Sequence, residues 1–146
     1  MKLHQLSVFS ENKPGHVVEP CRLLALEGID IRALSLADTQ RFGILRMIVS
    51  DWQKAKALLE AAGSVVKVTE VLAVEVPDRP GGLADVLGVL EGSGINIEYM
   101  YAFPFVRGQK AVLIFRFDQP DAALERLAEQ GVNVLAEGAL DPVAGC

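Results

Sequence analysis

An internal repeat is the feature of this sequence that most constrains its fold. The dipeptide Pro14-Gly15 recurs as Pro80-Gly81, which lies 66 positions later (80 minus 14). At the same offset, Gly28-Ile29-Asp30-Ile31 recurs as Gly94-Ile95-Asn96-Ile97. Matching Gly and Pro positions in the same order indicate that one structural unit is present twice, and a repeat has to be found before any fold is assigned.

The repeat continues to the end of each copy with a small shift. Gly63 matches Gly131 at an offset of 68 (131 minus 63), and a longer hairpin loop around residues 107–110 explains the two additional residues. We therefore divide the chain into residues 1–69 and 70–146. Each copy is near the lower size limit for a domain with its own core, so we expect the two to pack together.

Hydrophobic periodicity predicts the same order of elements in both copies: strand, helix, strand, strand, helix, strand. In the first copy we expect strands at residues 2–9, 29–36, 43–49 and 65–68, and helices ending near residues 26 and 62. In the second copy we expect strands at 72–76, 95–103, 111–117 and 132–135, and helices at 83–90 and from 120 onward. This order predicts the α+β class with ferredoxin-like βαββαβ units, each an antiparallel sheet with both helices on one face.

Helix starts and stops follow from capping residues. Asp51 is a candidate N-cap for the second helix of the first copy, and Pro120 suits the first position of its counterpart. In the second copy, the first helix shows a regular apolar stripe from Leu83 through Val86 to Leu90. In the first copy Pro20 replaces the residue that matches Val86, so that helix is expected to bend there or to begin late with Pro20 in its first turn.

The strand-to-helix bends, here called elbows, hold most of the candidate binding residues. The first elbow is Asn12-Lys13-Pro14-Gly15-His16, and the second is Asp78-Arg79-Pro80-Gly81-Gly82. Glycine lets a ligand approach the backbone, and the N–H groups and dipole of the following helix point at the elbow. Asp30 and Asn96 open the second strand of each copy, and together with Asn12 and Asp78 they place small polar groups at two repeated positions, which favours a ligand site. The alternative is structural, with these residues serving as turn and capping groups.

Composition and motifs exclude several classes of protein. The net charge of −5 opposes binding to a phosphate backbone, although Phe115 and Phe117 on a middle strand would suit base stacking. No apolar run approaches the roughly 20 residues of a membrane helix. The two histidines and two cysteines have no metal-ligand spacing, so no metal or other cofactor is expected. We expect Cys21 to be a buried thiol. We also expect the protein to be cytoplasmic.

Both copies of the repeat resemble the ACT domain family, whose members are small regulatory modules that bind amino acids. The motifs that carry the resemblance are residues 74–83 with Gly94-Ile95-Asn96-Ile97, and residues 12–15 with Gly28-Ile29-Asp30-Ile31. The resemblance covers both copies and implies side-by-side packing into one eight-stranded sheet. It also implies that ligands bind where the two copies meet. One site would use Asn12, Gly15 and His16 with Asn96, and the other would use Asp78, Gly81 and Gly82 with Asp30.

The resemblance implies a function without catalysis. The chain is similar to stand-alone tandem ACT proteins, and we expect it to bind an amino acid and to modulate a partner enzyme of amino-acid metabolism. A homodimer is left open, and neither nucleic acid nor membrane is expected as a partner. The alternative is a small enzyme on the same fold, an acylphosphatase-like hydrolase, for which Arg79 in the second elbow would be the phosphate-binding group. Lys13 occupies the matching position of the first elbow.

Overall fold

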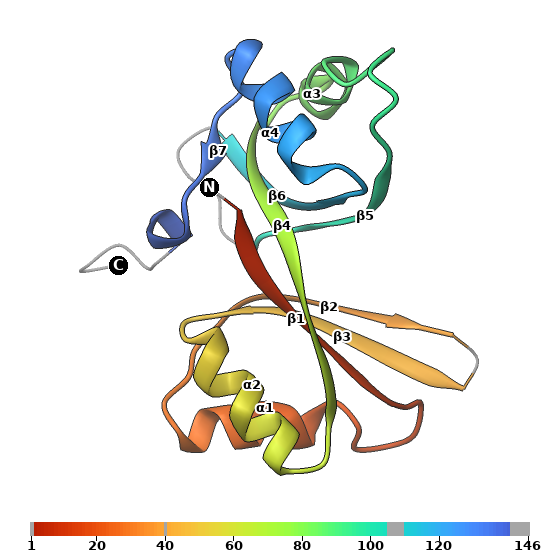
Figure 1. The fold of residues 1–146 in the computed structure, drawn as a ribbon, viewed down its shortest axis with the longest axis vertical. Helices are drawn as coiled ribbons and strands as arrows, with labels where there is room; N and C mark the ends of the chain where they lie inside the picture. Colours follow the sequence, from red (N-terminus) through yellow and green to blue (C-terminus); the bar gives the residue numbers. More distant parts are fainter. Residues whose placement is uncertain (1, 40, 105–109, 141–146) are drawn as a thin grey trace. The chain divides into compact units, whose positions relative to one another are not determined.

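The structure is a computed structural model that describes residues 2–39, 41–104 and 110–140 (Figure 1). The chain forms two compact units. The N-terminal unit is His4–Thr69, and the C-terminal unit combines Met1–Leu3 with Glu70–Cys146. Each unit is described separately below. The loop expected around residues 107–110 and the terminal Cys146 fall outside the described part, apart from Lys110.

The N-terminal unit has the order βαββαβ. Its elements are β1 (Leu3–Glu11), α1 (Val18–Leu26), β2 (Ile31–Asp38), β3 (Phe42–Val49), α2 (Trp52–Ala61) and the first residues of β4 (Val65–Pro77). The strands are ordered β2-β3-β1-β4, and β3 pairs antiparallel with both β1 and β2. Both helices lie on one face of this sheet (Figure 1). This is the predicted ferredoxin-like unit.

The C-terminal unit repeats that order. The remaining residues of β4 are followed by α3 (Gly82–Gly88), β5 (Ile97–Ala102), β6 (Lys110–Phe117), α4 (Pro120–Glu129) and β7 (Val134–Leu135), after which comes the 3₁₀ helix η1 (Glu137–Leu140). The strands are ordered β5-β6-β4-β7 with antiparallel pairing throughout. The α+β class with two βαββαβ units is therefore confirmed. The separate strands expected at 65–68 and 72–76 are one strand, β4, which contributes to both units.

Each unit has an apolar core between its helices and the adjacent sheet face. In the N-terminal unit, Leu24 of α1 and Leu59 of α2 are fully buried against the helix-facing side chains of β1 and β3. In the C-terminal unit, Val86 of α3 and Leu127 of α4 pack against β4 and β6. The aromatic pair Phe115 and Phe117 belongs to this second core, with stacked rings 5.4 Å apart, so these side chains are not available to stack on bases.

The predicted helix starts are confirmed at three places. Helix α1 begins at Val18, and Pro20 is its third residue, so the helix starts late and accommodates the proline in its first turn. The Asp51 side chain accepts a hydrogen bond from the Lys54 N–H at 3.1 Å and caps α2. Pro120 is the first residue of α4, where its missing N–H costs nothing.

Helix α3 differs from the sequence prediction in length and in the face that it buries. It ends at Gly88 instead of residue 90, because residues 89–91 continue with i→i−3 bonds, such as Leu90 N–H to Leu87 O at 3.0 Å. Leu83, expected on the buried stripe, is 37 % exposed, whereas Gly82 is buried. The helix predicted over residues 83–90 is therefore present, but it begins one residue earlier and ends two residues earlier, and Leu83 does not belong to its buried face.

Candidate functional site

The first elbow is a tight turn between β1 and α1. The carbonyl of Lys13 accepts a hydrogen bond from the His16 N–H at 3.3 Å, and Gly15 between them has φ of 89°. Pro at the second position and a left-handed Gly at the third define a type II turn. The backbone N–H of Asn12 donates to Arg41 O at 2.9 Å, which anchors the elbow to the start of β3. The side chain of Asn12 is exposed.

The second elbow repeats this turn one unit later. The carbonyl of Arg79 accepts from the Gly82 N–H at 3.0 Å, and Gly81 has φ of 83° and ψ of −8°. In both elbows the carbonyl of the turn glycine also accepts a hydrogen bond from the residue four positions later: Glu19 N–H donates to Gly15 O at 3.4 Å, and Asp85 N–H donates to Gly81 O at 2.9 Å. Asp78 is exposed. Both elbows therefore contain a Pro-Gly turn of the same kind, although the helix that follows begins at Val18 in one and at Gly82 in the other and their side chains differ at most positions.

Side-chain contacts around His16 are peculiar to the first elbow. Its Nδ1 lies 2.9 Å from the hydroxyl oxygen of Ser10 on β1, a pair that the sequence analysis did not identify. The imidazole also lies over Gly43 of β3, where an added Cβ would come within 2.8 Å of His16 Cε1. Ser10 and Gly43 therefore fix the ring beside the turn. In the second elbow the matching residue is Gly82, with no side chain to place.

An ion pair closes over the second elbow. Arg79 donates from Nη2 to an Asp85 carboxylate oxygen at 2.8 Å and from Nη1 to Pro80 O at 3.3 Å. The residue matching Arg79 in the first elbow, Lys13, instead lies 3.7 Å from Glu11. All these side chains are more than half exposed, so each pair adds little stability. The Arg79 guanidinium is nevertheless engaged, which disfavours its use as a free phosphate-binding group.

The residues that open the second strands also have equivalent surroundings. The backbone of Asp30 exchanges two hydrogen bonds with Ser50, at 2.9 Å to the Ser50 N–H and 3.0 Å to its hydroxyl. The backbone of Asn96 does the same with Asp118, at 3.1 and 2.9 Å. Their exposed side chains differ, because Asp30 forms an ion pair with Arg32 at 2.6 Å. The acidic charge expected at Asp30 is therefore compensated locally.

Within one unit, an elbow and the residue that opens the second strand do not come together. The first elbow adjoins the end of the sheet where β1 pairs with Gly43, whereas Asp30 lies at the other end, beside Ser50. Eight residues of β2 separate the two ends, which corresponds to roughly 25 Å of extended chain. In the C-terminal unit, Pro77 pairs with Lys110 at one end while Asn96 bonds Asp118 at the other. In each unit, the elbow and the start of the second strand therefore lie at opposite ends of the sheet.

Cys21 is the described cysteine, and it is only partly buried, so the expectation of a buried thiol is wrong. The burial that it does have raises the pKa of its thiol above the ordinary value. A thiol with a raised pKa is less reactive at neutral pH, because the thiolate is the nucleophile.

In the described ranges, no group of three or more His, Cys, Asp or Glu side chains is arranged to hold a metal ion. Over the same residues, no helix is long and apolar enough to span a bilayer.

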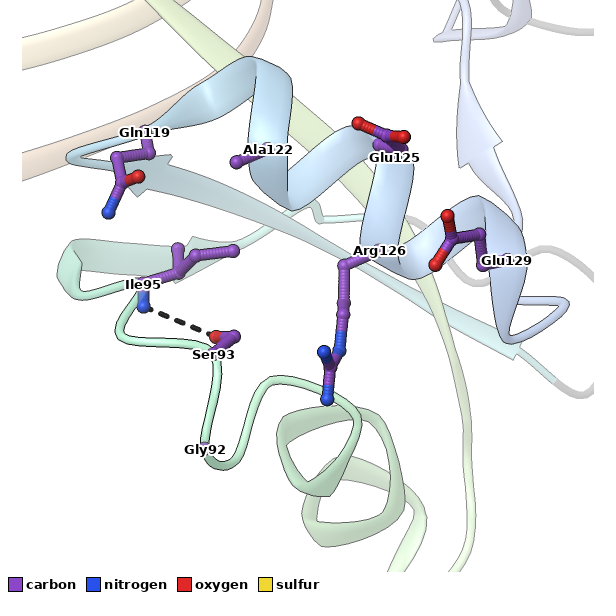
Figure 2. Close-up of a pocket in the computed structure, with 8 residues that line it drawn as sticks. All are labelled: Gly92, Ser93, Ile95, Gln119, Ala122, Glu125, Arg126 and Glu129. Carbon is purple, nitrogen blue, oxygen red and sulfur yellow. Dashed lines mark hydrogen bonds between the residues drawn. The ribbon is translucent and has the colours of Figure 1, made fainter.

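A hollow of about 370 Å³ lies in the C-terminal unit between α4 and the loop that follows α3 (Figure 2). Its lining is mostly polar and consists of Gly92, Ser93, Ile95, Gln119, Ala122, Glu125, Arg126 and Glu129. None of the eight predicted binding residues belongs to this lining. The hollow could not be predicted from the sequence, because carboxylates spaced along α4 are typical of an ordinary solvated helix face.

Two ferredoxin-like units with matching glycine turns before their first helices make up the described chain, and comparisons with known proteins agree with this tandem arrangement. The sequence model of the family described as ACT domain pair matches residues 1–144. The chain belongs to this family. The comparison with curated protein sequences finds no match.

Solved structures extend the likeness. The crystal structure of protein BT0572 from Bacteroides thetaiotaomicron is 40% identical, covers 98% of each chain and has a TM-score of 0.90. The ligand-free regulatory subunit of aspartate kinase from Thermus thermophilus is 18% identical, with 86% of this chain and 91% of that one covered and a TM-score of 0.63. The corresponding subunit from Thermus flavus is 17% identical, with 86% and 90% covered and a TM-score of 0.59. At these low identities, the two regulatory subunits show a shared fold.

Proposed function

We propose that this protein is a non-catalytic regulatory protein of the cytoplasm that binds a free amino acid and modulates a partner enzyme of amino-acid metabolism. Membership of the ACT domain pair family supports a regulatory role that depends on binding a small molecule. The observation that carries the proposal is the repeated elbow. The same type II turn precedes a helix in both units, with positive φ at Gly15 and Gly81. Backbone N–H groups at such a helix start suit an α-carboxylate.

The proposed sites pair each elbow with the strand start of the other unit. One uses Asn12, Gly15 and His16 with Asn96, and the other uses Asp78, Gly81 and Gly82 with Asp30. The opposite-end placement within each unit supports this pairing, because one unit cannot supply both features. Amide oxygens of Asn accept hydrogen bonds from an ammonium, and amide N–H groups donate to a carboxylate.

The two sites are proposed to be unequal. The first combines two neutral amides, whereas the second combines Asp78 with Asp30, whose charge is shared with Arg32. A neutral amino acid should therefore fill the first site before the second. Hydrolysis of acyl phosphates receives less support, because Arg79 is already paired with Asp85. An activity assay with an acyl phosphate is the direct check of that alternative, and turnover would replace the regulatory proposal.

A melting screen against the twenty amino acids tests the proposal. A ligand that binds only the folded state at about 100 times its dissociation constant adds roughly 2.7 kcal/mol to the free energy of unfolding. We expect one amino acid to raise the melting temperature and Asn96→Ala to reduce that rise. Asn133→Ala is the matched control, since Asn133 is an exposed amide outside both sites. The proposal fails if no amino acid at millimolar concentration moves the melting temperature.

A further inference from the structure

The free edge of β2 is a part of the N-terminal unit that its own helices leave uncovered. In the described part of the chain, β2 pairs with β3 alone and stands at the end of the strand order. Leu45 and Met47 of β3 are buried in the N-terminal core. Their neighbours on β2, Leu36 and Leu34, are 50% and 48% exposed. The helices therefore cover β3 but leave the same face of β2 open to solvent.

Backbone groups of β2 are also directed to this edge. Where β2 turns into β3, Thr39 and Phe42 exchange two backbone hydrogen bonds, at 2.8 and 3.1 Å. In an antiparallel ladder every second residue exchanges such a pair, so the odd-numbered residues from 33 to 37 direct their N–H and C=O groups to β3. The even-numbered residues from 34 to 38 direct theirs to the free edge. The exposed leucines and the free hydrogen-bonding groups thus belong to the same residues.

Features that usually protect a free edge are missing from this stretch. Residues 33–37 are Ala-Leu-Ser-Leu-Ala, without proline, lysine or any other charge. Long apolar edges of this kind associate with other strands unless they are blocked. The other terminal strand, β5, differs, because Glu98 forms an ion pair with Arg116 and Met100 packs against the C-terminal core. The β2 edge is therefore the one that is suited to a partner strand.

The sequence of β2 complements itself when two copies run antiparallel. With Ser35 of both copies on a twofold axis, Leu34 of one strand faces Leu36 of the other. At the ends of the strand, Arg32 falls opposite Asp38, so the charges have opposite sign. In this register the leucines occupy hydrogen-bonded pairs, since their backbone groups are the ones at the free edge. Apolar pairs in the centre and opposite charges at the ends both stabilise paired strands, which favours a second copy as the partner.

From the uncovered edge and its self-complementary sequence, we infer that β2 is the interface through which two copies of this chain associate. The two β2 strands pair antiparallel about an axis at Ser35 and join two N-terminal sheets into one. Leu34 and Leu36 of each copy form the apolar centre of the interface. Because both copies use the same strand, the contact closes at two chains. No residue of the proposed amino-acid sites belongs to this interface, so the association goes beyond the proposed function and does not depend on it.

Sedimentation velocity of the full chain tests this inference. We expect a mass of two chains at micromolar concentration. The double variant Leu34→Lys, Leu36→Lys puts like charges opposite each other at both central pairs, so its dissociation constant should rise by about a hundredfold or more. Leu26→Lys with Val65→Lys is the matched control, because it makes the same charge change at positions that are 82% and 66% exposed outside β2. That control should sediment as two chains.

A charge-complementation experiment separates a loss of association from a loss of folding. The double variant Leu34→Glu, Leu36→Glu should also be a monomer by itself. When it is mixed with the lysine variant, every central pair combines a lysine with a glutamate, so the mixture should sediment as two chains. A circular dichroism melt of each variant alone reports whether it is folded.

A cysteine on the proposed axis tests the register. In a chain that carries Cys21→Ser and Cys146→Ser, we expect Ser35→Cys to form a disulfide between two copies under mild oxidation. The Cα atoms of such a non-hydrogen-bonded pair are about 4.5 Å apart, which a disulfide can span. Ala33→Cys is the matched control, because in this register its two copies lie roughly 13 Å apart along the strands and should not be cross-linked.

Four results would overturn the inference. The first is a monomer of the unchanged chain at micromolar concentration, which would leave the edge to another kind of partner. The second is unchanged association of the lysine variant, which would place the interface elsewhere. The third is that the folded lysine and glutamate variants do not associate on mixing. The fourth is equal cross-linking of Ser35→Cys and Ala33→Cys, which would mean chance collision.

Discussion

The two elbows share a Pro-Gly turn but differ in what packs against it. In the first, the residue after the glycine turn is His16, whose ring lies over Gly43 and beside Ser10. In the second, the matching residue is Gly82, and an added Cβ would lie 2.0 Å from the carbonyl oxygen of Pro77. The second glycine of the second elbow is thus explained by close packing of α3 on β4. A glycine in a candidate binding motif can therefore be required for packing, as Gly82 is, while the glycine beside it, Gly81, forms the turn.

The first helices of the two units show the same contrast. Pro20 and Val86 occupy matching positions and are both buried. Because α1 begins at Val18, Pro20 falls in its first turn, whereas Val86 is the fifth residue of α3. The repeat therefore conserves which face is buried while the helix start moves along the sequence. The following predictions test these differences, beginning with the largest expected effect.

Exchanging the residues at the matching helix positions should have very unequal effects. Val86→Pro places a proline inside α3, where it removes a helical hydrogen bond and clashes with the preceding turn, so we expect a loss of about 3 kcal/mol or more. Pro20→Val should change the free energy of unfolding by about 1 kcal/mol or less, because that position lies in the first turn. Urea denaturation of both variants measures the difference. Equal losses would show that the two helix starts are equivalent.

The glycines of α3 should respond differently to alanine. Gly82→Ala forces its methyl group into the Pro77 carbonyl, so we expect a loss of about 3 kcal/mol from overpacking against backbone. Gly88→Ala meets no atom within 4 Å and should be neutral or stabilising by about 0.5 kcal/mol. Thermal melts of the two variants give the comparison. A mild effect at Gly82 would mean that α3 does not pack so tightly on β4.

Helices α2 and α4 have different residues at their N-termini, so substitutions at their N-caps should change the free energy of unfolding by different amounts. Asp51→Ala removes the bond to the Lys54 N–H and should cost about 1 kcal/mol. Gln119→Ala at the start of α4 removes no capping bond, and Pro120 already favours the helix start, so the change should stay within about 0.5 kcal/mol. Denaturant titrations resolve the two values, and a larger loss at Gln119 would contradict this account.

The ion pair over the second elbow should give the smallest effect. A double-mutant cycle of Arg79→Ala and Asp85→Ala should yield a coupling energy of about 0.5 kcal/mol, which salt should reduce. The matching pair, Lys13 and Glu19, should show no coupling, because Lys13 lies beside Glu11. Equal coupling in the two cycles would remove this distinction between the elbows.

Local chemistry explains which structural features could be predicted from the sequence. The repeat could be found from the matching positions of Gly and Pro in the two copies. The aligned residues Gly28 and Gly94 both have positive φ, at 70° and 77°. Capping by Asp51 and the first-turn position of Pro20 depend on nearby residues and were predicted too. The continuity of β4 and the exposure of Leu83 depend on long-range packing, which apolar periodicity does not encode. The same holds for the hydrogen bond between Ser10 and His16 and for the hollow beside α4.

Only some features of the candidate sites could be predicted from the sequence. The turn at each elbow followed from Pro14-Gly15 and Pro80-Gly81, because those residues restrict the backbone locally. The ion pair of Asp30 with Arg32 did not, because it depends on the side-chain direction at the start of β2. Pairing an elbow with the strand start of the other unit stays a prediction, supported by the family resemblance and by the separation of the two features within each unit.

Calorimetric titration of the stabilising amino acid into Asn96→Ala and Asp30→Ala, studied separately, tests the central claim most directly. The account predicts two binding events in the unchanged protein, with the tighter one lost in Asn96→Ala and the weaker one lost in Asp30→Ala. Equal losses in the two variants would contradict the inequality of the sites. Unchanged affinity and stoichiometry in both variants would contradict the claim that these strand starts take part in amino-acid binding.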